Sequence, residues 1–202
     1  MKILNRRMLG FSGALSVCFV VQVQASITTV VTPGNMDGWV FSADAIGAVG
    51  QMVTGPGTPP LGSGSAQLAV PAGQGGNSSQ LFETLSSPLA LSSLTSLSYS
   101  TYDTANNGQQ FPFLKLYLDN GDALYFEPPY QTPGTGGPAV VDQGPTALNQ
   151  WQTWNALSGA WWDDNTELGS GILYGGYKGV DTLAAYLALS GNADVAITKS
   201  AF

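Results

Sequence analysis

The stretch FLKLYLDNGDALYFE (residues 113–127) decides the fold, because it joins two alternating runs through a turn signal. In residues 114–118 three leucines alternate with Lys115 and Tyr117, which is the period-two pattern of a half-buried strand. The Asn-Gly pair at 120–121 tolerates positive φ at both positions, so the sequence predicts a β-hairpin. We expect the leucines to face a core and the lysine and tyrosine to face outward.

The rest of the chain continues in short apolar runs joined by connections rich in Gly, Pro, Ser and Thr. Residues 94–102 (LTSLSYSTY) alternate in the same way. One helix is predicted near residues 182–189 (TLAAYLAL), with Asp181 as its N-cap and Gly191 closing it. The sequence therefore predicts an all-β fold: a two-sheet antiparallel β-sandwich, jelly-roll-like, with one short helix near residues 182–189.

Composition excludes several kinds of chemistry. The chain has 202 residues, no histidine and one cysteine. Without histidine it cannot build a Ser-His-Asp or Cys-His nucleophile, nor a zinc site that uses imidazole ligands. A hydrophobic content of 44% is enough for a packed core, and the length suits one domain.

The first 25 residues have the pattern of a signal peptide. Lys2, Arg6 and Arg7 precede an apolar run over residues 8–21, and Val23-Gln24-Ala25 places small residues at −3 and −1. The run of fourteen residues is shorter than the ~20 that a membrane-spanning helix needs, so a retained anchor is the weaker alternative. We predict cleavage after Ala25, a single domain over residues 26–202, and a protein that is extracellular, periplasmic or on the cell surface.

Cleavage leaves an acidic protein. Residues 26–202 contain three lysines, no arginine and all thirteen acids, so their formal net charge is −10. Three scattered lysines cannot follow a phosphate backbone, and we expect no nucleic-acid partner. We likewise expect no membrane span after cleavage. The one cysteine, Cys18, leaves with the signal peptide, so no disulfide is expected in the mature protein.

Exposed aromatic residues on a secreted β protein are candidates for glycan binding, because the C–H faces of sugars pack on rings. In a strand, the spacing of Trp151 and Trp154 sends the two rings to opposite faces, and adjacent Trp161 and Trp162 also divide between faces. Packing in the core is the alternative for each ring. The predicted binding residues are Trp154, Trp162, Trp151, Tyr125 and Tyr130.

A cluster of acids near the second tryptophan pair predicts a calcium-binding loop. It consists of Asp163, Asp164, Asn165 and Glu167, which offer the hard oxygen ligands that Ca²⁺ prefers. The spacing is not that of an EF-hand, and a solvated loop is the alternative. Apart from a possible structural Ca²⁺, the sequence implies no cofactor.

Catalysis is a distant alternative. A glycoside hydrolase needs two carboxyl groups across its scissile bond, and Glu83 and Glu127 are the pair that strands could present together. The sequence lacks the paired-glutamate strand motifs of small jelly-roll xylanases and the Glu-x-Asp-x-x-Glu signature of other sandwich glycanases. No Gly-x-Ser-x-Gly elbow occurs either. The sequence therefore favours a protein that is not an enzyme.

Turn-rich and aromatic stretches are spread over most of the mature chain: DGW (37–39), GPGTPPLGSGSAQL (55–68), LTSLSYSTY (94–102), WQTWNALSGAWW (151–162) and TLAAYLALSGNADVAI (182–197). Together they resemble a group of secreted bacterial β-sandwich proteins of unassigned function. That group is similar to carbohydrate-binding and concanavalin-like sandwiches, and some members carry a C-terminal PEP-CTERM sorting tail. Residues 201–202 end this chain without such a tail, so we expect a C-terminally truncated form of a surface-anchored protein.

The resemblance and the aromatic content favour the same function. We expect a secreted, non-catalytic β-sandwich that acts as an extracellular glycan-binding module, with a polysaccharide as its partner. A structural protein of the cell surface or matrix, without a small ligand, is the alternative. The two differ in whether the tryptophan and tyrosine rings on the outer faces contact a ligand.

Overall fold

A computed structural model describes residues 30–44, 46–72, 78–105, 111–132, 141–163 and 181–202, and the statements below concern these residues. The predicted signal peptide lies outside them. The elements are β1 (Val40–Ala43), β2 (Val49–Thr54), β3 (Gly64–Ala69), β4 (Ser79–Ala90), β5 (Ser98–Tyr102), β6 (Leu114–Leu118), β7 (Ala123–Phe126), β8 (Trp151–Asn155), β9 (Trp162–Asp163), α1 (Leu183–Ala188) and β10 (Ala196–Ala201). Three short 3₁₀ turns, Leu91–Ser93, Pro128–Tyr130 and Ala156–Ser158, connect strands.

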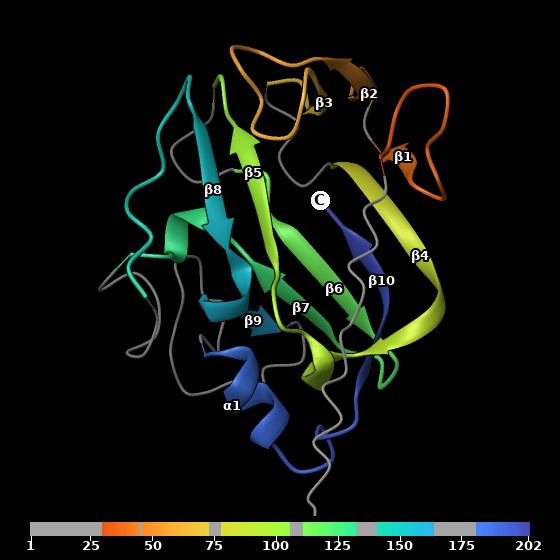
Figure 1. The fold of residues 1–202 in the computed structure, drawn as a ribbon, viewed down its shortest axis with the longest axis vertical. Coiled ribbons are helices and arrows are strands. Elements are labelled where there is room, and N and C mark those ends of the chain that lie inside the picture. Colours follow the sequence, from red (N-terminus) through yellow and green to blue (C-terminus); the bar gives the residue numbers. More distant parts are fainter. Residues whose placement is uncertain (1–29, 45, 73–77, 106–110, 133–140, 164–180) are drawn as a thin grey trace, which may run out of the picture.

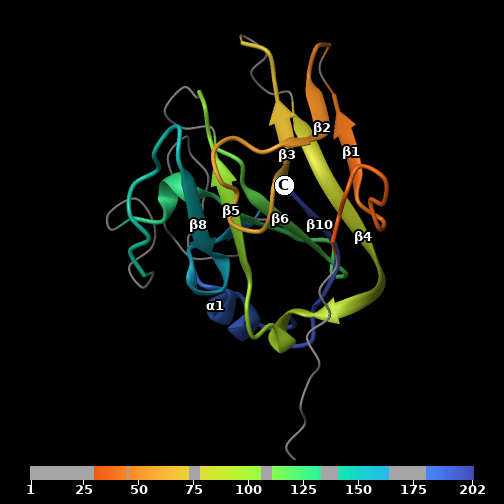
Figure 2. The ribbon, with the colours of Figure 1, turned by 45° about the horizontal axis from the view of Figure 1, so that its top comes forward.

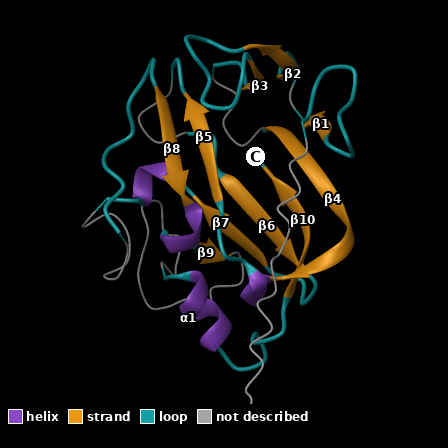
Figure 3. Ribbon diagram, viewed as in Figure 1, coloured by secondary structure: helices purple, strands orange, loops and turns teal. Residues whose placement is uncertain are grey.

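The strands form one large sheet and two small ones, and every strand pairing is antiparallel. The large sheet has six strands in the order β1-β4-β10-β6-β7-β9. The pairs β2-β3 and β5-β8 form the small sheets (Figures 1 and 2). The predicted all-β class is confirmed, and α1 is the single α-helix of the described residues. The other helical segments coloured purple in Figure 3 are the 3₁₀ turns.

The predicted hairpin is confirmed and lies in the large sheet. Leu114 pairs with Phe126 and Leu116 with Leu124, and Gly121 in the connecting turn has a φ of 94°. The leucines of β6 are all buried, whereas Lys115 and Tyr117 are only half-buried on the other face. The alternation along β6 therefore gives the sheet a core face, covered by leucine, and an opposite face.

The core lies between this leucine face and the β5-β8 pair, which crosses over it (Figures 1 and 2). Trp154 of β8 is 1% exposed and packs in one cluster with the leucines of β6 and with Phe126. Tyr99 of β5 meets Phe126 edge to face, with ring centroids 5.9 Å apart. The second layer over the core thus has two strands here, and a complete two-sheet jelly-roll sandwich stays a prediction.

The predicted helix is present, but its N-cap is not Asp181. Thr182 caps α1, because its hydroxyl accepts from the backbone N–H of Ala185 at 3.1 Å. Asp181 instead exchanges two backbone hydrogen bonds with Trp161. Tyr186 of α1 donates its hydroxyl hydrogen to Asp122 at 2.6 Å and thereby joins the helix to the turn of the hairpin.

The uneven burial of leucines in the large sheet predicts unequal costs for one substitution at two positions. Leu116 is 2% exposed on β6, and Leu89 is 44% exposed on β4. We expect Leu116→Ala to lower the free energy of unfolding by about 2–5 kcal/mol, because it leaves a cavity in the core. Leu89→Ala should cost less than about 1 kcal/mol. Urea denaturation measures both, and equal losses would contradict the assignment of Leu116 to the core.

Candidate ligand-binding face

The face of the large sheet opposite the leucines collects aromatic and basic side chains from successive strands. The register sets Lys115 of β6, Tyr125 of β7 and Trp162 of β9 directly across from one another. On the other side of β6, Tyr117 pairs with Lys199 of β10. Directly opposed residues on one face of a sheet are close enough to interact, so these side chains form a row across the strands.

The row is a continuous stack of rings and ammonium groups. The rings of Trp162 and Tyr125 are parallel to within 2°, with centroids 3.8 Å apart. The Nζ atom of Lys115 lies 4.4 Å from the ring centroids of both Tyr125 and Tyr117. The Nζ atom of Lys199 lies 4.9 Å from the Tyr117 centroid and 3.9 Å from that of Phe82 on β4. We call these six residues the ring–lysine ladder: Phe82, Lys199, Tyr117, Lys115, Tyr125 and Trp162.

Each lysine of the ladder is held by rings on two sides. A cation over an aromatic face gains about 0.5–1 kcal/mol at an exposed site and about 2 kcal/mol when desolvated. For Lys115, burial lowers the pKa, but hydrogen bonding and electrostatic attraction to Tyr125 and Tyr117 outweigh it, and the net pKa is raised. The ammonium group of Lys115 therefore keeps its charge while the rings fix its position.

The stacking decides which groups of the ladder a ligand can reach. Parallel rings 3.8 Å apart leave no space between them, so Trp162 and Tyr125 cover one face of each other. The lysines cover further ring faces. A ligand above the sheet therefore meets ring edges, phenol hydroxyls and ammonium groups. Phe113, 37% exposed and 6.1 Å from the Tyr125 ring, extends the surface with an apolar group.

Glu127 lies at the end of β7 on the same face as Tyr125. Burial raises the pKa of its carboxyl to about 7, and a hydrogen bond donated by the Trp162 side chain opposes the rise. The same hydrogen bond holds the indole in place at the outer end of the ladder. Glu127 is thus a carboxyl group whose charge changes near neutral pH.

A buried glutamine fixes the segment that brings Trp162 to the sheet. The Gln131 side chain, 0% exposed, accepts from the backbone N–H of Ala160 at 2.8 Å and donates to its carbonyl at 3.0 Å. It also donates to the carbonyl of Glu127 at 3.0 Å. A Cβ on Gly159 would lie 2.1 Å from the Phe126 ring and 2.7 Å from Gln131, so this close packing requires glycine. Nothing in the sequence around Gln131 indicated this role.

The five predicted binding residues fall into three places. Tyr125 and Trp162 stack in the ladder, and Tyr130 packs with Trp162 against Ala160. Trp151 lies on the small β5-β8 sheet, where its indole N–H donates to the carbonyl of Pro56 at 2.8 Å.

The assignment of Trp154 to the binding surface is wrong. Its indole is 1% exposed and donates to the Thr101 hydroxyl at 2.8 Å within the core. The two tryptophans of β8 do point to opposite faces, as the i,i+3 spacing indicated, and Trp154 is the inward one.

The structure does not bring Glu83 and Glu127 together as a catalytic pair. Glu83 pairs with Ser200, which pairs with Leu116, so Glu83 lies in the row of the core face. Glu127 follows Tyr125 on the opposite face. A glycoside hydrolase holds both carboxyl groups about 5–10 Å apart around one bond, which two faces of a sheet do not allow.

The predicted calcium loop falls largely outside the described residues, which include Asp163 but not Asp164, Asn165 and Glu167. Asp163 is 3% exposed and pairs with Leu124, on the core side of β9. Within the described ranges no group of three or more acids, cysteines or histidines is placed to hold a metal ion. The calcium site stays a prediction.

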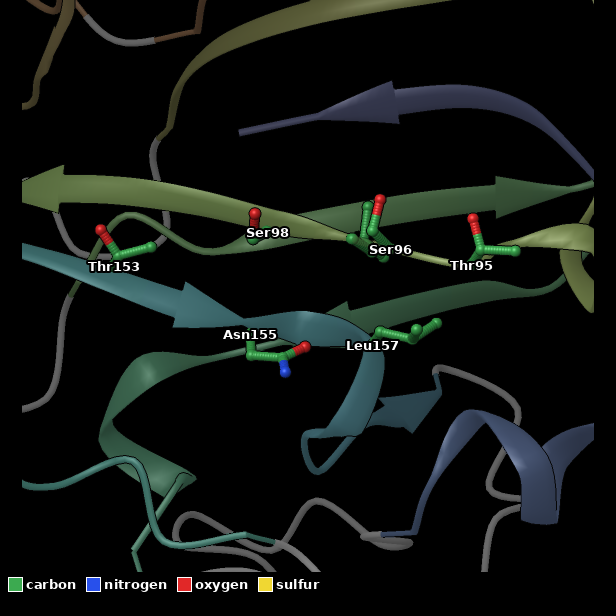
Figure 4. Close-up of a pocket in the computed structure, with 7 residues that line it drawn as sticks. Thr95, Ser96, Ser98, Thr153, Asn155 and Leu157 are labelled. Carbon is green, nitrogen blue, oxygen red and sulfur yellow. The ribbon is translucent and has the colours of Figure 1, made fainter. Parts of the chain in front are cut away.

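A separate open groove of about 300 Å³ runs along the small β5-β8 sheet (Figure 4). Hydroxyl and amide groups line much of it, and a hydrogen bond of 2.8 Å joins Ser100 to Thr153 across the two strands. The groove carries no charged side chain. Its lining residues are Thr95, Ser96, Leu97, Ser98, Thr153, Asn155 and Leu157.

No known protein family, curated protein or solved structure was found to match the chain. In the part of the chain that the structure describes, no helix combines the length and the apolar character needed to cross a bilayer.

The raised pKa of Glu127 predicts a pH-dependent stability. Its carboxyl binds a proton more tightly in the folded state, at a pKa of about 7, than at its ordinary value of 4.5. Its contribution to stability is complete below about pH 4.5 and is lost as the pH rises through 7. We expect the free energy of unfolding to fall by as much as about 3 kcal/mol over this interval.

Glu127→Gln keeps a neutral side chain at every pH and provides the control. Its unfolding free energy, measured by urea denaturation from pH 4.5 to pH 8, should lack this decline. If the unfolding free energy of the variant falls with pH as steeply as that of the wild type, Glu127 has an ordinary pKa.

Proposed function

We propose that the protein is a secreted, non-catalytic module that binds an extracellular polysaccharide through the ring–lysine ladder and Phe113. The observation that carries the proposal is the gathering of four rings and two ammonium groups on one outward sheet face. Such a face combines apolar edges with hydrogen-bond donors, which is what a sugar surface of C–H groups and hydroxyls requires.

The shape of the face supports a polymeric ligand. Small molecules bind mainly in concave pockets that bury most of their surface. The ladder instead crosses five strands of the large sheet, from Phe82 on β4 to Trp162 on β9. A chain molecule lying across the strands could contact several rungs at once, and the sum of weak contacts would supply its affinity.

Binding without catalysis fits the placement of the acids. Glu127 borders the ladder, whereas Glu83 belongs to the core face of the sheet. Export after cleavage at Ala25 belongs to the same proposal, since an extracellular polysaccharide is met only outside the cell. A structural role without ligand is the second candidate, favoured by the ring faces that already pack on one another.

The test is affinity electrophoresis of the protein in gels that contain neutral or anionic polysaccharides. Wild-type protein should be retarded by at least one polymer, and Trp162→Ala and Tyr125→Ala should each weaken retardation about tenfold or more. Trp151→Ala is the matched control, because it removes a tryptophan from the small sheet. It should leave retardation unchanged.

Thermal unfolding by circular dichroism separates lost binding from lost folding in these variants. A folded Trp162→Ala protein without retardation supports the binding face. Retardation by no polymer would contradict the proposal and favour the structural role. Equal losses of retardation in the Trp151→Ala and Trp162→Ala proteins would show that the ladder is not the binding surface.

A further inference from the structure

We infer that the ligand of the ring–lysine ladder is an anionic polysaccharide, whose carboxylate or sulfate groups bind the ammonium groups of Lys115 and Lys199. This inference rests on the proposed function and adds the chemical class of the ligand.

The placement of the lysines is the first argument. Residues 26–202 contain three lysines and no arginine against thirteen acids. The sequence indicated that these lysines are scattered, but the fold brings two of them to the same ring. Lys115 and Lys199 approach the Tyr117 ring to 4.4 Å and 4.9 Å from their respective Nζ atoms. A strongly acidic chain thus concentrates positive charge on the face that also bears the rings.

The charge on these lysines is not neutralised by the groups that hold them. Lys115 lies against the rings of Tyr117 and Tyr125, and the interactions that raise its pKa come from these two tyrosines. Lys199 lies against Phe82 and Tyr117. Neutral rings orient an ammonium group without cancelling its charge, so both cations stay available to an anion.

The stacking of the rings gives the second argument. Neutral sugars bind best to a free ring face, but Trp162 and Tyr125 each cover one face of the other, and the lysines cover further ring faces. The groups of the ladder that can interact most strongly with a ligand are therefore the ammonium groups and phenol hydroxyls. Hydrogen bonds from a charged donor to an anionic acceptor are about twice as strong as neutral ones.

Glu127 borders the ladder beyond Tyr125 on β7, two strands away from Lys199 on β10. Glu127 shares a hydrogen bond with Trp162, at the β9 end of the ladder. Lys199 is on β10, on the far side of β6 and β7. An anionic polymer can therefore contact Lys199, Tyr117 and Lys115 without passing over the Glu127 carboxyl.

The experiment compares four polymers of similar length by isothermal titration calorimetry: polygalacturonate, dextran sulfate, neutral dextran and a single-stranded DNA oligomer. We expect one or both charged polysaccharides to bind at least tenfold more tightly than dextran, with an affinity that falls as NaCl rises. The carboxylate and sulfate arms identify which acid group is preferred.

Variants then assign the effect to the two lysines. The double variant Lys115→Met, Lys199→Met keeps unbranched apolar side chains between the rings and should lose at least tenfold in affinity for the charged polysaccharide. Lys115→Arg, Lys199→Arg retains both charges and should retain binding.

Each result has a distinct meaning. Equal binding of dextran and the charged polysaccharides, unaffected by the methionine variants, would overturn the selection of anions and leave the proposed function standing. Tighter binding of DNA than of either charged polysaccharide would overturn the inference in favour of a nucleic-acid ligand. If the protein binds none of these four polymers and no polymer in the gels above, both the selection of anions and the proposed function are overturned.

Discussion

The alternation along β6 is the constraint on which the rest of the structure depends. Its three leucines are buried, and a shift of the strand by a single residue would expose all of them and bury Lys115 and Tyr117. Hydrophobic burial therefore locks the register of the neighbouring strands. That same register sets Tyr125, Trp162 and Lys199 beside the outward residues of β6. The ring–lysine ladder is thus a consequence of packing on the opposite side of the sheet.

Local interactions position Trp162 at the β9 edge of the ladder. The two-residue strand β9 is too short to be held by strand pairing alone, and the buried Gln131 side chain bonds to the backbone of Ala160 next to it. The indole of Trp162 is then held between its stack on Tyr125 and its hydrogen bond to Glu127. A side chain fixed by several partners loses little further entropy when a ligand binds, which favours a preorganised surface.

Much of the fold was readable from the sequence, because its signals are local. The leucine alternation and the Asn-Gly turn predicted the hairpin, and the apolar run after residue 181 predicted the helix. The N-cap was assigned one residue too early because Asp181 and Thr182 are both good caps, and tertiary pairing of Asp181 with Trp161 decides between them.

The site was harder to predict, because it depends on which strands become neighbours. Trp154 and Trp162 look alike in sequence, yet the pairing of β8 with β5 turns one into the core, and the pairing of β9 with β7 turns the other outward. Glu83 and Glu127 divide between faces for the same reason, and the approach of Lys115 to Lys199 requires the pairing of β6 with β10. The buried Gln131 belongs to no sequence pattern.

The claim that the ladder is the ligand surface is tested most directly by nuclear magnetic resonance of the indole N–H groups during titration with an oligogalacturonate. Each tryptophan gives its own signal, assigned by single substitutions. We predict that the Trp162 signal shifts with ligand, while the signals of the buried Trp154 and Trp161 stay in place. A Trp162 signal that stays fixed while that of Trp151, on the small sheet, shifts would contradict it.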